Sequence, residues 1–435
     1  MNNIFFYILL LIFFSNCSFN SQSSFWTKEK KIKEQAKYIK IYKFSENEEI
    51  SINEFNKNIK IKFNAKLLNN SFVNNLDNNN SMINYDGSLQ KVSKYKFSKI
   101  KNFNKLEPDL IFHNNGLIFF DNKGTILNFD SNSKLIWKKN IYTKKEQKLN
   151  PILFFASDKN ILVVTDSIGS YYALNIENGE LIWKKNHTSP FNSQIKIYNN
   201  KLFTIDFESK LNCVSIKDGK ILWSVQTEDS FVKSIKKLSL IVKNNLVIFN
   251  NTIGDVIAVN IDTGDTVWLT PTQSSAIYAE AFKLKVSDVI SESNSIYFSN
   301  NKNEFYSLSL ESGIINWKQK VSSSLRPTVV GKLIFTISSD GLLYVIEKDS
   351  GNIVRITDIF SDLKKKERKN TKPIGFIVGK KNIYLTTSRG RLFLIDIENG
   401  KTKKILKIDN GKISRPLFLN DSLYIAKDDS IIKLQ

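Results

Sequence analysis

The sequence predicts an all-β fold, an eight-bladed β-propeller built from four-stranded antiparallel blades. Three observations lead to this prediction. A unit recurs along the chain with 40 to 49 residues between copies, each unit holds short strands of alternating apolar residues, and a tryptophan recurs at one place in the unit. Four-stranded units of this length bury their two faces against neighbouring units, which is typical of a propeller. A ring of seven blades is the alternative.

Each unit contains an apolar strand, a turn and a second strand of alternating pattern. The first strand is found at residues 161–166, 201–206, 246–251, 295–300, 333–338 and 382–387. The second strand occurs eight times and begins mostly at a glycine, at Gly124, Gly169, Ser209, Gly254, Asn303, Gly341, Gly390 and Asp429. Glycine at its head suits a turn position with positive φ, and the period of two is that of a strand packed between layers.

The eighth copy reaches the C-terminal Gln435 before its unit is complete. We therefore expect N-terminal strands to complete the last blade, with residues 88–99 and 58–64 as the candidates. Closing the ring in this way fixes both ends of the chain and removes an open sheet edge.

A turn of the form Asp/Asn-x-x-x-Gly follows the second strand in most copies, and a tryptophan stands four residues after its glycine. We expect these residues to pack between blades, because a large ring fills the wedge between two sheets. They are Trp137, Trp183, Trp223, Trp268 and Trp317. Stacking on a ligand is the alternative. Arg355 and Lys404 take the position in the next two copies, so the motif weakens toward the C-terminus.

The N-terminus divides into a leader and a tether before the propeller. The apolar run from residue 4 to 14 is too short to span a bilayer comfortably and fits the centre of a signal peptide. Cys17 follows it, in a position that resembles the lipidated cysteine of bacterial lipoproteins. We predict a lipoprotein-type signal peptide at 1–16, a tether at 17–54 and the propeller at 55–435. An ordinary cleaved signal peptide or a membrane anchor is the alternative.

The charge is strongly positive, with 63 Lys and Arg against 42 Asp and Glu and a formal net charge of +21. No zinc-finger spacing, RNA-recognition signature or basic helix accompanies it, so we expect no nucleic-acid partner. The lysines are scattered and predict a solvated basic surface. The basic segment 361–373 is read as a solvated loop, with contact to anionic lipid or an acidic partner as the alternative.

Residues that could support catalysis or metal binding are sparse. Cys213 occupies a small-residue position of a repeat and predicts a buried thiol, while His113 and His187 lack zinc spacing. The sequence has no Cys-Cys pair, no Cys-x-x-Cys-His haem motif and no Gly-x-Ser-x-Gly. We therefore expect no metal, no cofactor and no enzymatic activity.

The pattern Gly-x-Leu-x-Ala-Leu-Asp-x-x-x-Gly-x-x-x-Trp resembles the repeat of quinoprotein-type (PQQ-like) propellers over residues 110–435. One branch of that superfamily contains quinoprotein dehydrogenases. The other contains the outer-membrane protein assembly factor B (BamB) lipoproteins. A lipoprotein-like leader, a propeller without a haem domain and eight units favour the second branch.

Two loops resemble those by which that family contacts the central barrel subunit of the β-barrel assembly machinery. In the segment 279–293, Ser287, Asp288 and Val289 match the core of one loop, while Ile290 stands where a second acidic residue is usual. The resemblance extends to the segment 231–237, through Val232, Ile235 and Lys236. The alternative is that both segments are ordinary connections between blades.

The resemblance implies a non-catalytic scaffold lipoprotein that aids the folding and insertion of outer-membrane proteins. Its partners would be the central barrel subunit, unfolded outer-membrane proteins and, through the lipid anchor, the membrane. It would lie at the periplasmic face of the outer membrane. A periplasmic PQQ-dependent dehydrogenase and a glycan-binding propeller are the alternative functions.

Overall fold

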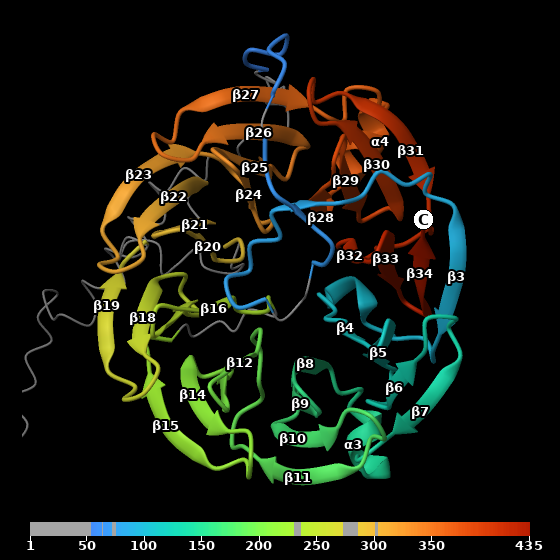
Figure 1. The fold of residues 1–435 in the computed structure, drawn as a ribbon, viewed down its shortest axis with the longest axis vertical. Helices are drawn as coiled ribbons and strands as arrows, with labels where there is room; N and C mark the ends of the chain where they lie inside the picture. The colour runs from blue at the N-terminus through green and yellow to red at the C-terminus, as the bar shows by residue number, and fades with distance from the viewer. Residues whose placement is uncertain (1–53, 63, 72–74, 230–235, 273–285, 301–302) are drawn as a thin grey trace, which may run out of the picture. The chain divides into compact units, whose positions relative to one another are not determined.

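The computed structural model describes residues 54–62, 64–71, 75–229, 236–272, 286–300 and 303–435. Within these residues, eight antiparallel sheets stand around a common axis, each with its first strand nearest the axis and its fourth at the rim (Figure 1). The predicted fold class and the count of eight blades are confirmed.

Blades 1 to 6 each use four consecutive strands. Blade 1 contains β4 Ile111–His113, β5 Gly116–Phe120, β6 Ile126–Phe129 and β7 Leu135–Lys139. Blade 2 contains β8 Leu153–Asp158, β9 Ile161–Asp166, β10 Ser170–Asn175 and β11 Leu181–Asn186. Blade 3 contains β12 Lys196–Tyr198, β13 Lys201–Ile205, β14 Lys210–Ser215 and β15 Ile221–Gln226.

Blades 4 to 6 continue the pattern. Blade 4 contains β16 Leu240–Lys243, β17 Leu246–Asn250, β18 Val256–Asn260 and β19 Thr266–Thr270. Blade 5 contains β20 Ile290–Glu292, β21 Ser295–Ser299, β22 Glu304–Ser309 and β23 Ile315–Lys320. Blade 6 contains β24 Thr328–Val330, β25 Leu333–Ile337, β26 Leu342–Glu347 and β27 Ile353–Asp358.

The last two blades incorporate N-terminal strands. Blade 7 contains β28 Pro373–Val378, β29 Asn382–Thr387, β30 Arg391–Asp396 and β31 Thr402–Lys407, with β2 Met82–Ile83 and β1 Leu67–Leu68 added in parallel at its inner edge. Blade 8 contains β32 Leu417–Leu419, β33 Ser422–Lys427 and β34 Ser430–Leu434, and its fourth strand is β3 Lys91–Lys96.

The ring is closed by β3, which pairs with the C-terminal strand β34 and places Ser93 opposite Lys433. Of the two candidates for the closing strand, residues 88–99 are therefore correct and residues 58–64 are wrong. The second stretch runs instead past blade 7, where the amide of Ile61 donates to the carbonyl of Glu398 at 2.8 Å. The edge it was expected to cover is already paired with β3.

The tryptophans of the repeat lie on the fourth strand of one blade and reach the turn of the next. The indole Nε1 of Trp137 donates to the carbonyl of Ile176 at 3.1 Å, and that of Trp183 to Ile216 at 2.8 Å. Trp223, Trp268 and Trp317 make the corresponding bonds to Ile261, Leu310 and Lys348. At Gly179, where φ is +74°, an added Cβ would lie 2.8 Å from the Trp137 ring. The glycine thus serves both the turn and the packing of the neighbouring indole.

Arg355 makes the same contact in blade 6. Its side chain is fully buried, and Nη2 donates to the carbonyl of Ile397 at 3.2 Å in the turn of blade 7. Nη1 donates to Glu398 of that turn and to Ile59 of the N-terminal segment. The motif is therefore chemically changed at this position and not lost, contrary to the expected weakening.

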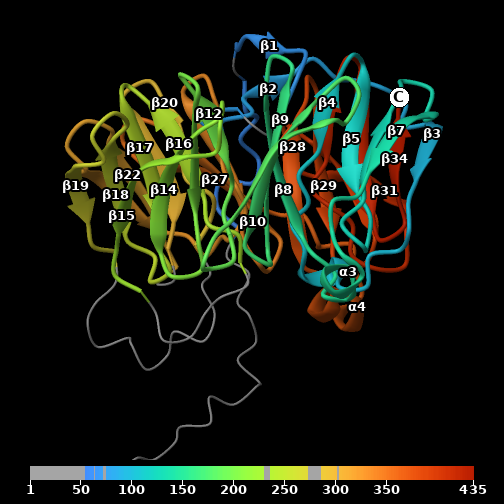
Figure 2. The ribbon, with the colours of Figure 1, turned by 90° about the horizontal axis from the view of Figure 1, so that it is seen from below.

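The two ends of the propeller differ. The helices α3 Lys144–Lys148 and α4 Lys365–Asn370 belong to connections between blades and lie at one end, whereas β1 and β2 lie at the other (Figure 2). We call the first end the connector face, because the described connections that carry α3 and α4 from a fourth strand to the next first strand lie there. Neither helix, nor any other in the described part of the chain, is long and apolar enough to cross a membrane.

Candidate functional site

The connections between blades bring polar side chains to the axis at the connector face. Each connection ends at a first strand near the axis, and in six connections the position two or three residues before that strand supplies a polar side chain to one cluster. This position holds Asp109 before β4, Gln194 before β12, Lys237 before β16, Asp288 before β20, Arg326 before β24 and Arg415 before β32. The repeat thus gathers residues that are far apart in sequence into one charged cluster, which we call the tunnel mouth.

Asp288 is at the centre of the tunnel mouth. Its Oδ2 accepts from Nε and Nη2 of Arg326, both at 2.6 Å, and from Nε2 of Gln194 at 3.0 Å. The residue is only 8% exposed. Burial by itself would raise the pKa of this carboxyl, but the cations of Arg326, Lys236, Arg415 and Lys237 hold it well below its ordinary value. Asp288 is therefore a fixed anion.

A second ion pair crosses the tunnel mouth. Nζ of Lys237 in the connection to blade 4 lies 2.6 Å from Oδ1 of Asp109 in the connection to blade 1, and both side chains are 8% exposed. Together with the Asp288–Arg326 pair it surrounds a cavity of about 60 Å³, which Leu325, Arg415 and Ser324 also line. A volume of this size accommodates a small polar group.

The other predicted partner-binding residues have different environments. Ser287 and Val289 are buried: the hydroxyl of Ser287 accepts from the amide of Ser299 at 2.8 Å, and the carbonyl of Val289 accepts from Asn78 at 3.0 Å. Lys236 is half-buried and Nζ donates to the carbonyl of Ser324 at 3.2 Å. Val232, Ile235 and Cys17 lie outside the described residues. Only Asp288 and Lys236 of the described set therefore stand close to the tunnel mouth.

The N-terminal segment enters the ring from the opposite end. Figure 1 shows it crossing the centre beside β16 and β28. Asn78 is fully buried, and its Nδ2 donates to Oε1 of Gln194 at 2.8 Å and to the carbonyl of Leu240 at 3.2 Å. Nζ of the buried Lys196 donates to Oδ1 of Asn78 at 2.7 Å and to the carbonyl of Asn75. Burial lowers the pKa of Lys196 well below its ordinary value.

This axial contact was not predicted from the sequence. The stretch around Asn78 is rich in asparagine and has no apolar period, so it looks like a linker. Its hydrogen-bond partners belong to blades 3, 4 and 5 or to the connections before them, and no pattern in the sequence around Asn78 predicts these partners. The contacts connect Asn78 through Gln194 to Asp288, so side chains of the N-terminal segment and of the connections between blades meet at the axis.

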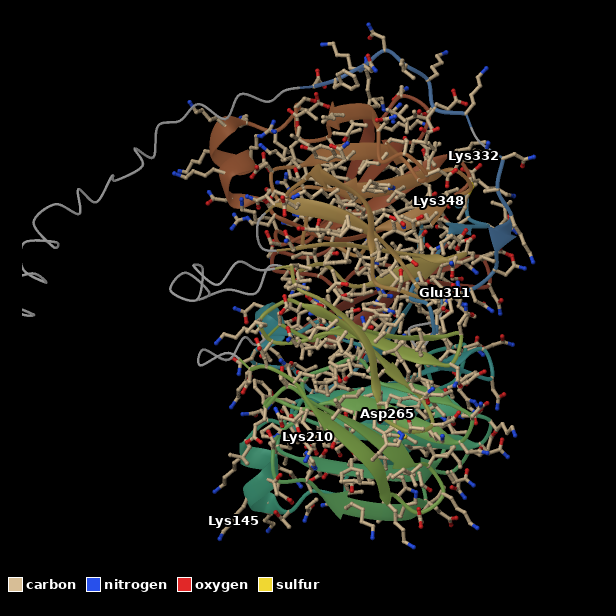
Figure 3. The ribbon with its side chains drawn as sticks, turned by 90° about the vertical axis from the view of Figure 1, so that its left-hand side faces the viewer. Lys145, Lys210, Asp265, Glu311, Lys332 and Lys348 are labelled. Atoms are coloured by element: carbon tan, nitrogen blue, oxygen red, sulfur yellow. The ribbon has the colours of Figure 1, made fainter. Side chains whose placement is uncertain are left out.

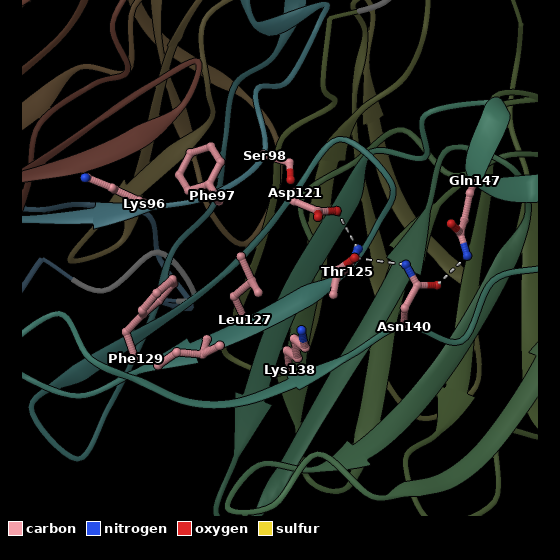
Figure 4. Close-up of a pocket in the computed structure, with 11 residues that line it drawn as sticks. Lys96, Phe97, Ser98, Asp121, Thr125, Leu127, Phe129, Lys138, Asn140 and Gln147 are labelled. Atoms are coloured by element: carbon pink, nitrogen blue, oxygen red, sulfur yellow. Dashed lines mark hydrogen bonds between the residues drawn. The ribbon is translucent and has the colours of Figure 1, made fainter. Parts of the chain in front are cut away.

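A larger groove of about 580 Å³ lies at the rim, between β3 and blade 1 (Figure 4). Its polar groups bind one another: Oδ1 of Asp121 accepts from the amide of Thr125 at 2.9 Å, and Nδ2 of Asn140 donates to the Thr125 hydroxyl at 3.0 Å. These side chains stabilise the loops of blade 1. Asp121 is a buried charged residue of the groove, and its Oδ1 is bound by the amides of Lys123 and Thr125 in its own turn.

The outer surface carries charges of both signs. Lys145, Lys210, Lys332 and Lys348 lie on one side of the molecule together with Asp265 and Glu311 (Figure 3). In the basic segment 361–373, Nη1 of Arg368 in α4 lies 2.6 Å from Oδ2 of Asp358, the last residue of β27. Within the described residues, no group of three or more His, Cys, Asp or Glu could hold a metal ion.

Comparison with known proteins gives relatives of low identity that cover most of the chain. The outer membrane protein assembly factor BamB of Shewanella oneidensis is 22% identical over 325 residues, which is 61% of this chain and 79% of that protein. An uncharacterized protein of Rickettsia conorii is 19% identical over 380 residues, with 82% and 88% covered.

Solved structures share the architecture. BamB from Moraxella catarrhalis superposes with a TM-score of 0.66 at 15% identity, over 80% of this chain and 99% of that chain. A quinohemoprotein alcohol dehydrogenase from Comamonas testosteroni superposes with a TM-score of 0.62 at 9% identity, over 81% and 78%. At these identities the likeness shows the propeller fold alone.

The family comes from the sequence match. A family model described as outer membrane protein assembly factor BamB matches residues 122–357, which is more than half of the 435-residue chain and spans the tryptophan-bearing repeats of blades 1 to 5. The chain therefore belongs to the family of outer membrane protein assembly factor BamB.

Proposed function

We propose that the chain is a non-catalytic scaffold in the assembly of outer-membrane proteins. The family match is the observation that carries this proposal. The scaffold would be anchored through a lipid on Cys17 at the periplasmic face of the outer membrane, with residues 1–16 removed and 17–54 as the tether. It would bind the central barrel subunit of the assembly machinery and aid the folding and insertion of unfolded outer-membrane proteins.

The tunnel mouth is the surface we assign to the barrel subunit. It unites a fixed anion, Asp288, with cations from several blades, and charge pairs of this kind fix the register of a protein partner and exclude wrong ones. We propose that Val232 and Ile235, which lie outside the described residues, contribute apolar contacts to the same interface. Asp288 and Lys236 would make the polar contacts of the interface, while Ser287 and Val289 hold the loop in place.

An enzymatic function is disfavoured by the axis itself. Asn78, Gln194 and Asp288 bind one another along it, so a ligand on the axis would have to break these hydrogen bonds. The likeness to a quinohemoprotein alcohol dehydrogenase is a likeness of fold, at 9% sequence identity. These contacts favour the scaffold over the PQQ-dependent dehydrogenase, and the glycan-binding propeller stays the second alternative.

Affinity purification from detergent-solubilised membranes tests the proposal. A C-terminally tagged chain should bring down the barrel subunit in stoichiometric amount. Asp288→Asn, which keeps the size of the side chain and removes its charge, should reduce the recovered subunit severalfold. Asp265→Asn is the matched control, because Asp265 is exposed at the rim. Recovery of the tagged chain alone, or equal recovery with both variants, would contradict the proposal.

A further inference from the structure

Arg415 is a half-buried cation at the tunnel mouth. Its aliphatic stem lies against Gly375, where an added Cβ would come within 2.5 Å of it, and its guanidinium lines the 60 Å³ cavity of the tunnel mouth. Among the described residues, none forms a hydrogen bond or an ion pair with this guanidinium. Burial, and next the charge of Arg326, lower the pKa of Arg415 to about 9.

Arg326 lines the same cavity, and one nitrogen of its guanidinium makes no hydrogen bond to a described residue. Its side chain is 7% exposed, and Nε and Nη2 are bound to Asp288. Nη1 is buried and has no hydrogen-bond partner within the described part of the chain. A buried N–H group without a partner destabilises the fold, and more so when it is charged, so an acceptor at this point would stabilise the site.

Among the described side chains that line the cavity, the cations outnumber the buried carboxylates by one. Asp109 is paired with Lys237, and Asp288 is paired with Arg326. Arg415 is the cation that forms no ion pair with a described residue. Glu107 also lines the cavity but is exposed, so water screens its charge. One excess positive charge matches a monoanion better than a dianion.

We propose that the tunnel mouth is a binding site for a single carboxylate, that of an acidic side chain in a partner polypeptide. Nη1 of Arg326 and the guanidinium of Arg415 would donate to its two oxygens, since guanidinium groups match carboxylates in geometry. Leu106, Leu325 and Ile374 line the same cavity and offer apolar contact to the chain that carries the acid. The assignment to a polypeptide rests on the proposed scaffold function.

The chain contains only six arginines, so the NMR signals of individual arginine side chains can be followed directly. In the purified full chain labelled with ¹⁵N-arginine, the Nε–Hε resonances can be assigned with single Arg→Gln variants. The probes are the peptide acetyl-Gly-Glu-Gly-amide and its neutral counterpart acetyl-Gly-Gln-Gly-amide. We expect the glutamate peptide to shift the signals of Arg326 and Arg415, and the glutamine peptide to leave them in place.

Two variants sharpen the result. Arg415→Gln should weaken the binding of the glutamate peptide by about 10-fold or more, because a charge-assisted hydrogen bond is lost. Arg389→Gln removes the same charge from an exposed turn and should leave the affinity unchanged. Equal shifts with both peptides, or an Arg415→Gln variant that binds as the wild type does, would overturn the proposal.

Inorganic phosphate distinguishes a peptide carboxylate from a free anion. A site that takes phosphate and not the glutamate peptide would also overturn the proposal. Failure here is distinguishable from failure of the scaffold function. If the barrel subunit still co-purifies while the peptide fails to bind, only the carboxylate site is wrong. If the peptide binds and no subunit co-purifies, the scaffold function is wrong.

Discussion

Single residues of the repeat are interchangeable when they supply the same hydrogen bond. A tryptophan indole covers the next turn in five blades, and Arg355 covers it in blade 6. In blade 8 the hydroxyl of Tyr95 donates to the carbonyl of Ser131 in the turn of blade 1 at 3.2 Å. What the position requires is a large side chain, partly or fully buried, with a donor at its end.

Lys404 is the exception, and the topology explains it. In blade 8 the third strand is the C-terminal β34 and the fourth is the N-terminal β3, so no turn joins them. Blade 7 therefore has no such turn to cover, and Lys404 is exposed. The apparent loss of the motif near the C-terminus follows from where the ring is closed.

Arg355 and Lys404 give a matched pair of substitutions in the same position of the repeat. Arg355→Ala removes a fully buried side chain and its hydrogen bonds to three carbonyl groups, of which that of Ile397 is buried. It should lower the free energy of unfolding by about 2 to 4 kcal/mol. Lys404→Ala should change it by less than about 0.5 kcal/mol. Urea unfolding followed by circular dichroism measures both. Similar losses in the two variants would show that Arg355 does not replace the tryptophan.

The charge of Asp288 makes a pH-dependent contribution to stability. Its folded pKa is below the ordinary value of about 3.9. The contribution is therefore fully present above the unfolded pKa and is lost as the pH falls through the folded pKa. The difference in unfolding free energy between wild type and Asp288→Asn should be constant from about pH 5 to 8 and shrink below about pH 4. A difference that stays constant into acid would mean that the carboxylate is not held by the cations.

At the scale of elements, the repeat was readable because each blade obeys the same local rules. Period-two strands, glycine turns and the tryptophan position predicted all eight third strands, and the truncated last copy predicted closure by the N-terminus. The choice between 88–99 and 58–64 was not decidable from local pattern, because both alternate apolar and polar residues. Pairing with β34 depends on where the chain lies after it leaves the axis.

A cross-link tests the closing element. Ser93 is paired with Lys433 across β3 and β34, and its buried hydroxyl makes no hydrogen bond of good geometry with the described part of the chain, so Ser93→Cys should be tolerated. We expect Ser93→Cys with Lys433→Cys to form a disulfide that raises the unfolding free energy by up to about 4 kcal/mol, since it closes a very long loop. Non-reducing electrophoresis and urea unfolding with and without reductant measure this. Ser93→Cys alone is the control, and a double variant that stays reduced would argue against the pairing.

At the scale of the whole molecule, the ring gathers at its axis residues that the sequence keeps apart. Asp288 was singled out by a short local resemblance, but Gln194, Arg326 and Arg415 were not, because each sits alone in its own connection. Their common position before a first strand could have revealed them once the strands were placed. Asn78 could not be found in that way, since it belongs to no repeat.

The central claim is that the connector face, at the tunnel mouth, binds the barrel subunit. Photo-cross-linking in intact cells tests it most directly, with p-benzoylphenylalanine placed at Ser324, which is exposed and lines the cavity. The same group at Glu177, exposed in a turn between third and fourth strands at the opposite end, is the control. We predict a cross-link to the barrel subunit from position 324 and none from position 177. A cross-link from position 177 with none from position 324 would contradict the account.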